Sequence, residues 1–282
     1  MALSGIQLER IVETALAEDM AWGDITTDTI IPPRLEGKAT IVVREEGVLA
    51  GVEVASLVFS RADGLLKVGL AREDGAHLLP GEVIATISGP VSGILKGERT
   101  ALNFLQRMSG IATETSRYVA AVKGLKTVIC DTRKTTPGLR VLEKYAVRMG
   151  GGKNHRSNLG DGVLIKDNHR AVLASQGIPL SQAVRKAREQ APHELKVEVE
   201  VDTLEQAREA LAAGADIIML DNMSIEDMRR AVVELGGRVP LEASGGVTLE
   251  RVRSIAETGV DLISVGALTH SPHALDISLE LG

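Results

Sequence analysis

The chain contains a single cysteine, Cys130, so it cannot build an internal disulfide framework. Cys130 ends an apolar run that includes Val128 and Ile129, which favours a small buried hydrophobic side chain over a reactive thiol. No stretch approaches the roughly 18 consecutive apolar residues of a membrane-spanning helix, and the first residues lack the basic segment and apolar core of a signal peptide. We therefore expect a cytoplasmic protein with no membrane partner.

Aromatic residues are also scarce, with one Trp, two Tyr and two Phe in 282 residues. Proteins that bind single-stranded nucleic acid stack its bases on aromatic side chains, and five rings are too few for such a platform. The formal net charge of −6 further disfavours a nucleic-acid partner. The length is sufficient for one large barrel or two domains, with a substantial core.

Positive charge is concentrated in one part of this acidic chain. Residues 133–170 hold nine Lys or Arg against three acids, a local charge of +6, so the remaining residues sum to −12. Clustered charge in a cleft raises the local concentration of ligands of opposite sign. The sequence therefore predicts a focused site for anionic ligands within this stretch.

The apolar pattern divides the chain into two parts. Apolar residues at helical spacing from Leu8 to Leu16 predict an amphipathic helix, and short apolar runs at 39–43, 48–50 and 65–70 predict strands of an α+β unit. A long helical pattern over 98–122, interrupted at Gly110, then leads toward a second domain.

From Thr127 onward, short apolar strands alternate with helical segments, which is typical of a parallel α/β barrel. The carboxyl ends of the strands build the active site in such barrels. The six predicted strands are residues 127–130, 162–166, 196–201, 216–220, 239–243 and 261–265.

Glycine turns follow the last two predicted strands. Ser244, Gly245 and Gly246 precede a helix expected to begin near Thr248, and Gly266 follows the final strand. Backbone N–H groups at a helix start bind anions, and these two loops are a recurrent phosphate site in barrels. The alternative is that the glycines serve only tight turns.

Cationic side chains follow other strands of the barrel. Arg133 and Arg156 can each hold a carboxylate through a planar fork, whereas Lys134 and Lys166 are point charges suited to phosphate oxygens. His155 can donate a hydrogen bond to a carboxylate or move a proton. The alternatives are solvated surface charges and a structural histidine.

Two carboxylates end neighbouring strands of the barrel. Glu200 and Asp221 can hold Mg²⁺, mostly through water, or ribose hydroxyls. Glu198 has the same parity as Glu200, but Glu200 lies nearer the carboxyl end of its strand and is the predicted ligand. A structural ion pair between Glu200 and Lys166 is the alternative.

At these positions the chain resembles the quinolinate phosphoribosyltransferases, or carboxylating nicotinate-nucleotide pyrophosphorylases, of NAD biosynthesis. The resemblance rests on ordered motifs: EDMAWGDITT, GERTALNFLQRMSGIAT, DTRKTTPGLRVLEKYAVRMGGGKNHR, LIKDNH, VEVEV, IMLDN, EASGG and SVGA. It implies an α/β fold with an amino-terminal α/β sandwich domain (residues 1–110) and an open, incomplete TIM-like barrel (residues 111–267). An arrangement in which the carboxyl terminus, about 268–282, rejoins the first domain stays open.

The resemblance also implies a pentosyltransferase that converts quinolinate and phosphoribosyl pyrophosphate to nicotinate mononucleotide, pyrophosphate and CO₂, with Mg²⁺ accompanying phosphoribosyl pyrophosphate. It implies a homo-oligomer, a dimer or hexamer, in which Arg99 reaches the neighbouring subunit's site. The catalytic residues that it implies are Lys134, Lys166, Glu200 and Asp221. The last two would also bind Mg²⁺, mostly through water. The implied substrate-binding residues are Arg99, Thr132, Arg133, Lys134, His155, Arg156, Lys166, Glu200, Asp221, Ser244, Gly245, Gly246 and Gly266.

The residue types support this chemistry without the resemblance. Attack of the pyridine nitrogen on the ribose carbon needs anions held in place and developing charge stabilised, with no covalent nucleophile. Three alternatives remain: a Schiff-base aldolase using Lys166, a relative of the same fold associated with molybdenum transport, and a non-catalytic sugar-phosphate binder.

Overall fold

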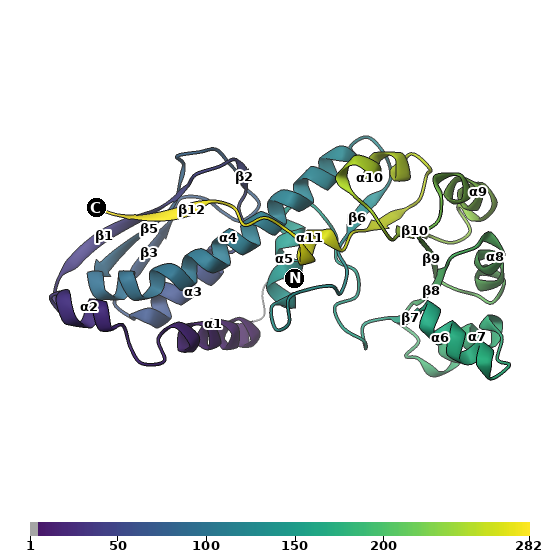
Figure 1. Ribbon diagram of the computed structural model, residues 1–282, viewed down its shortest axis with the longest axis horizontal. Coiled ribbons are helices and arrows are strands. Elements are labelled where there is room, and N and C mark those ends of the chain that lie inside the picture. Colours follow the sequence, from purple (N-terminus) through teal and green to yellow (C-terminus); the bar gives the residue numbers. More distant parts are fainter. Residues whose placement is uncertain (1–4) are drawn as a thin grey trace. The chain divides into compact units, whose positions relative to one another are not determined.

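The computed structural model describes residues 5–282, and these divide into two compact units (Figure 1). The first unit contains the described residues up to Ser116 together with Thr135–Gly151 and Leu268–Gly282. The second contains Arg117–Lys134 and Gly152–Ala267. The chain therefore leaves the first unit twice: residues 117–134 and 152–267 form the second unit, and residues 135–151 and 268–282 belong to the first.

The first unit is built on a four-stranded antiparallel sheet in the order β12, β1, β5, β3. Its helices α3 and α4 cover one face of this sheet (Figure 1), and Phe59 of α3 and Leu105 of α4 are buried. The bounds are β1 (Glu36–Val43), β3 (Lys67–Leu70), β5 (Val83–Pro90), β12 (Ile277–Leu281), α3 (Val52–Ala62) and α4 (Val91–Ala121).

The other elements of this unit are short, except for the predicted first helix. That helix, α1 (Gly5–Asp19), buries Leu8, Val12 and Leu16, one face at helical spacing. The remaining elements are α2 (Ile25–Ile30), α5 (Arg140–Met149), α11 (Ala267–His270) and the two-stranded pair of β2 (Gly47–Val48) with β4 (His77–Leu78).

Helix α4 runs unbroken through Gly110, where the sequence pattern is interrupted. A Cβ at this position would lie 1.9 Å from the backbone carbonyl oxygen of His273. The glycine is thus explained by the close approach of the carboxyl-terminal segment, which then continues into β12 beside β1.

The second unit is a six-stranded parallel sheet in the order β6, β11, β10, β9, β8, β7. All six strands predicted from Thr127 onward are present, and each strand from β7 to β10 leads into one or two helices. Their bounds are β6 (Val128–Cys130), β7 (Val163–Ile165), β8 (Val197–Val201), β9 (Ile217–Asp221), β10 (Leu241–Ser244) and β11 (Leu262–Ser264). The helices are α6 (Asp167–Ser175), α7 (Leu180–Gln190), α8 (Leu204–Ala212), α9 (Ile225–Leu235) and α10 (Leu249–Ala256).

The barrel is open, because β6 and β7 are the two edges of this sheet and do not pair with each other. A closed (β/α)₈ barrel has eight strands, so the expected incomplete barrel is confirmed. Cys130, at the end of β6, is buried as predicted. Within residues 5–282, no helix is both long and apolar enough to cross a membrane.

Candidate active site

The parallel strands of the second unit present their carboxyl ends at a common rim. Thr132, Arg133 and Lys134 follow β6, Lys166 follows β7, and Glu200 is the penultimate residue of β8. The second unit thus holds every predicted site residue except Arg99, which lies exposed on α4 in the first unit. The others at or just beyond the rim are His155, Arg156, Asp221, Ser244, Gly245, Gly246 and Gly266.

The loop after β10 has a backbone geometry that requires glycine. Gly245 and Gly246 have φ values of 88° and 56°, which side chains rarely adopt. A Cβ on Gly245 would also lie 2.2 Å from Oδ1 of Asn222. Asn222, with φ 53°, is the one non-glycine residue at positive φ among residues 5–282. The loop thus lies close to Asn222 at the end of β9, and main-chain N–H groups in such glycine turns can bind an anion.

Glu200 and Asp221 extend from neighbouring strands β8 and β9, as predicted. Burial raises the pKa of Glu200 most, and the charge of Asp221 raises it further, while the backbone N–H of Asp167, 3.3 Å from Oε1, opposes the shift. Asp221 accepts a hydrogen bond from the amide of Asn222 at 2.8 Å. The half-buried Glu200 carboxylate, with the Asp221 carboxylate at the end of the next strand, forms a site that a hard cation would stabilise.

Arg133 and Arg156 are a pair of positively charged side chains that influence each other. Burial lowers the pKa of Arg156 most, and the positive charge of Arg133 lowers it next. The Arg156 guanidinium donates a hydrogen bond from Nη1 to the carbonyl oxygen of Gly162 at 2.8 Å. Like charges held close together in a half-buried place favour an anion between or beside them.

The basic stretch that the sequence singles out is divided between the two units. Residues 135–151 belong to the first unit, where the buried carboxylate of Glu143 accepts hydrogen bonds from Arg107 and Thr136. The cations of this stretch that belong to the second unit are therefore those on either side of residues 135–151. Their grouping at the strand ends, rather than the run itself, locates the candidate anion site.

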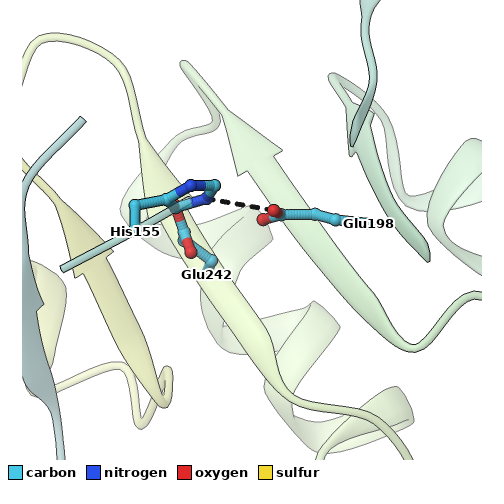
Figure 2. Close-up of side chains that lie close together, drawn as sticks. All are labelled: His155, Glu198 and Glu242. Atoms are coloured by element: carbon cyan, nitrogen blue, oxygen red, sulfur yellow. Dashed lines mark ion pairs between the residues drawn. The ribbon is translucent and has the colours of Figure 1, made fainter. Parts of the chain in front are cut away.

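The ring of His155 lies against two carboxylates inside the barrel (Figure 2). Its Nε2 lies 3.0 Å from Oε2 of Glu198 and 3.6 Å from Oε1 of Glu242. Glu198 and Glu242 are only 5% and 1% exposed. Neither carboxylate is among the predicted site residues. Each is an acid flanked by apolar residues within a predicted strand, a pattern that indicates an inward-facing polar group.

Asp131 is a third acidic residue that the sequence did not predict for the site. It is completely buried after β6, its Oδ1 accepts the backbone N–H of His155 at 2.8 Å, and its Oδ2 accepts the side-chain amide of Asn154 at 2.6 Å. This carboxylate ties the segment that carries Arg156 to the end of β6.

Glu242 is expected to make stability depend on pH. Burial first, and then the charge of Glu198, raise its pKa to about 7 from 4.5, so the folded state binds this proton more tightly than the unfolded state does. That contribution is complete below about pH 4.5 and is lost as the pH rises through about 7. The wild type should therefore lose about 3 kcal/mol of its free energy of unfolding as the pH rises, and Glu242→Gln should not show this loss.

The measurement is urea unfolding of the wild type and Glu242→Gln at pH 5 and pH 8. The wild type should lose stability relative to the variant between these values. Parallel changes in the two proteins would show that Glu242 does not hold its proton in the folded state.

Comparison with known proteins gives consistent matches over both units. Residues 24–109 match the family described as quinolinate phosphoribosyl transferase, N-terminal domain, and residues 111–280 match its C-terminal domain. The chain is 45% identical over 279 residues to a probable carboxylating nicotinate-nucleotide pyrophosphorylase of Bacillus subtilis, covering 99% of this chain and 95% of that protein. It is also 48% identical over 276 residues to the carboxylating nicotinate-nucleotide pyrophosphorylase of Mycobacterium leprae, covering 96% of this chain and 95% of that protein.

Solved structures agree with the sequence relatives. The nicotinate-nucleotide pyrophosphorylase from Francisella tularensis superposes with a TM-score of 0.94 at 41% identity, covering 99% of this chain and 97% of that one. The enzyme of that name from Ehrlichia chaffeensis gives a TM-score of 0.92 at 39% identity, with both chains fully covered.

Proposed function

The chain belongs to the quinolinate phosphoribosyltransferase family, and from this premise we propose how its residues perform the reaction. The enzyme is a pentosyltransferase that joins quinolinate to phosphoribosyl pyrophosphate, giving nicotinate mononucleotide, pyrophosphate and CO₂. The observation that carries the residue roles is the common rim, where cations follow β6 and β7, carboxylates end β8 and β9, and glycine turns follow β10 and β11.

Quinolinate binds through its two carboxylates to the cationic side of the rim. Arg133 and Arg156 supply forked donors, and their mutual repulsion is relieved when a dianion lies against them. Thr132, next to Arg133, adds a hydroxyl donor. Such a clamp orients the ring nitrogen, whose lone pair must point at the reacting carbon.

Phosphoribosyl pyrophosphate binds at the glycine turns and the carboxylates. Its 5-phosphate accepts hydrogen bonds from main-chain N–H groups near Ser244, Gly245, Gly246 and Gly266. Its ribose hydroxyls lie toward Glu200 and Asp221. The half-buried pair fits a hard cation, because burial and the charge of Asp221 raise the pKa of Glu200. Mg²⁺ held there, mostly through water, would neutralise charge on the pyrophosphate group.

The chemistry then needs no nucleophilic side chain. The ring nitrogen forms a bond to the anomeric carbon while the bond to pyrophosphate breaks, and the electron pair leaves with pyrophosphate. Lys134 and Lys166, both exposed at the rim, stabilise this departing charge. The bond from the ring to the 2-carboxylate then breaks to release CO₂, and a proton takes its place on the ring carbon.

The direct test is an assay with quinolinate, phosphoribosyl pyrophosphate and Mg²⁺ that follows nicotinate mononucleotide, with nicotinate as the control substrate. Product should form from quinolinate and not from nicotinate. A folded protein that forms no product would instead support the molybdenum-associated relative, and borohydride trapping of a sugar phosphate on Lys166 would support the aldolase.

We also propose that the enzyme is a homo-oligomer, a dimer or hexamer, in which Arg99 completes the site of the neighbouring subunit. This proposal is supported by the position of Arg99, which is exposed on α4 in the first unit, whereas every other substrate-binding residue lies in the second.

Complementation between two inactive variants tests the shared site. Mixing Arg99→Ala with Lys166→Ala should restore activity, because each hybrid dimer contains one site with both residues intact. Random exchange of subunits should restore about a quarter of wild-type activity. Subunit exchange is followed by mass spectrometry of differently tagged chains, and exchange without recovered activity would contradict a site shared through Arg99.

A further inference from the structure

The cluster of His155, Glu198 and Glu242 has no role in the chemistry described above. Glu198 comes from β8 and Glu242 from β10, with β9 between them, so both project into the barrel from strands two apart. Their side chains meet at the ring of His155 (Figure 2). An isolated carboxylate is costly to bury, so two of them in one place need a partner that offsets the desolvation.

The cluster has the composition of a metal site, and its three ligand atoms lie within 4.8 Å of one another. The hydrogen bonding of the ring opposes that assignment. Nδ1 of His155 accepts the backbone N–H of Arg156 at 2.8 Å, which places the single proton of a neutral ring on Nε2. A metal ion on Nε2 would have to displace this proton and leave an imidazolate, so the proton itself bridges the ring to Glu198.

The orientation of this ring determines what holds the backbone of Arg156. Asp131 accepts the N–H of His155, and the ring of His155 accepts the N–H of Arg156. If the ring turns away, the second of these acceptors is lost. Glu198, 3.0 Å from Nε2, is well placed to hold the ring in this orientation, and its charge also favours the charged form of Arg156.

We propose that Glu198 is a positioning residue for quinolinate binding, which acts on Arg156 through the ring of His155. This inference rests on the proposed function. Glu242 packs against the same ring nitrogen and limits where the Glu198 carboxylate can lie. His155 then links a buried carboxylate to a binding arginine.

The test compares Glu198→Gln with Glu198→Ala in steady-state kinetics. Gln keeps an oxygen that accepts the Nε2 proton, so its KM for quinolinate should stay within about threefold of wild type. Ala removes the acceptor and should raise this KM by about tenfold or more, while the KM for phosphoribosyl pyrophosphate changes less than about twofold. Glu194→Ala, which removes a side chain 83% exposed before β8, is the matched control.

Two outcomes overturn the proposal. Equal increases in both KM values, accompanied by a lower melting temperature, would mean that Glu198 only stabilises the barrel. Unchanged kinetics in Glu198→Ala would mean that the ring needs no carboxylate to hold it.

A second readout does not depend on turnover. Nitrogen-15 NMR of the His155 ring, assigned with His155→Gln, should show the Nε2–H tautomer in the wild type and Glu198→Gln, and a mixture of ring states in Glu198→Ala. One equivalent of tightly bound metal that Glu198→Ala loses would overturn the proposal. A correct tautomer in a protein without activity would contradict the proposed function and leave the positioning role in place.

Discussion

Arg133→Ala is expected to raise the KM for quinolinate by about a hundredfold, with a much smaller change in the KM for phosphoribosyl pyrophosphate. Arg133 follows β6 at the rim, and its charge lowers the pKa of Arg156, so the two guanidiniums lie close together. A forked hydrogen bond between charged groups contributes about 1.5–3 kcal/mol, and a factor of one hundred corresponds to about 2.7 kcal/mol. The loss should therefore fall mainly on the dicarboxylate substrate.

Arg133→Lys separates charge from geometry. Lysine keeps the positive charge but cannot make two parallel hydrogen bonds, so its KM should lie between those of the wild type and the alanine variant. Arg188→Ala is the control, because Arg188 lies in the same unit and pairs with Asp216 at the surface. If Arg133→Ala leaves the quinolinate KM near the wild-type value, Arg133 does not hold a carboxylate.

Lys166→Ala is expected to lower kcat by about two to three orders of magnitude. Lys166 stands directly after β7, and Glu200 lies near the end of the neighbouring strand β8, so the proposed site has this lysine near the ribose and pyrophosphate. A preorganised cation acts most strongly on charge that develops as the bond breaks, so kcat should fall more than either KM rises. Single-turnover measurements with saturating substrates isolate this step.

Two comparisons make this result interpretable. Lys186→Ala removes an exposed lysine from α7 in the same unit and should leave the kinetics unchanged. Lys166→Arg keeps the charge in a different shape and should retain part of the activity. Near-normal turnover of Lys166→Ala would remove this residue from the chemistry.

The strands of the second unit could be predicted because each is a short apolar run that ends in polar residues. This pattern is local, and it located Glu200, Asp221 and Ser244 at the rim without knowledge of the sheet order. Glu198 and Glu242 have the same local signature, but their importance depends on the histidine that they meet. His155 is 43 residues from Glu198, and its ring direction is set by a hydrogen bond that no pattern encodes.

The path of the chain between the units is another feature that local pattern does not determine. Helix α5 has an apolar face, which predicts that it packs on a core but not on which one. Its place in the first unit depends on contacts such as Glu143 with Arg107, 36 residues away. Strand β12 similarly depends on pairing with β1 across most of the chain length.

The open seam of the barrel has a consequence for assembly in the cell. Sheet edges offer unpaired backbone groups to other chains, and long flat edges promote aggregation. The two edges here are strands of only three residues, Val128–Cys130 and Val163–Ile165, and Cys130 also forms a parallel bridge with Lys153. Such short edges offer few backbone hydrogen bonds to a strand of another chain, so this open barrel is expected to resist edge-to-edge aggregation at high protein concentration.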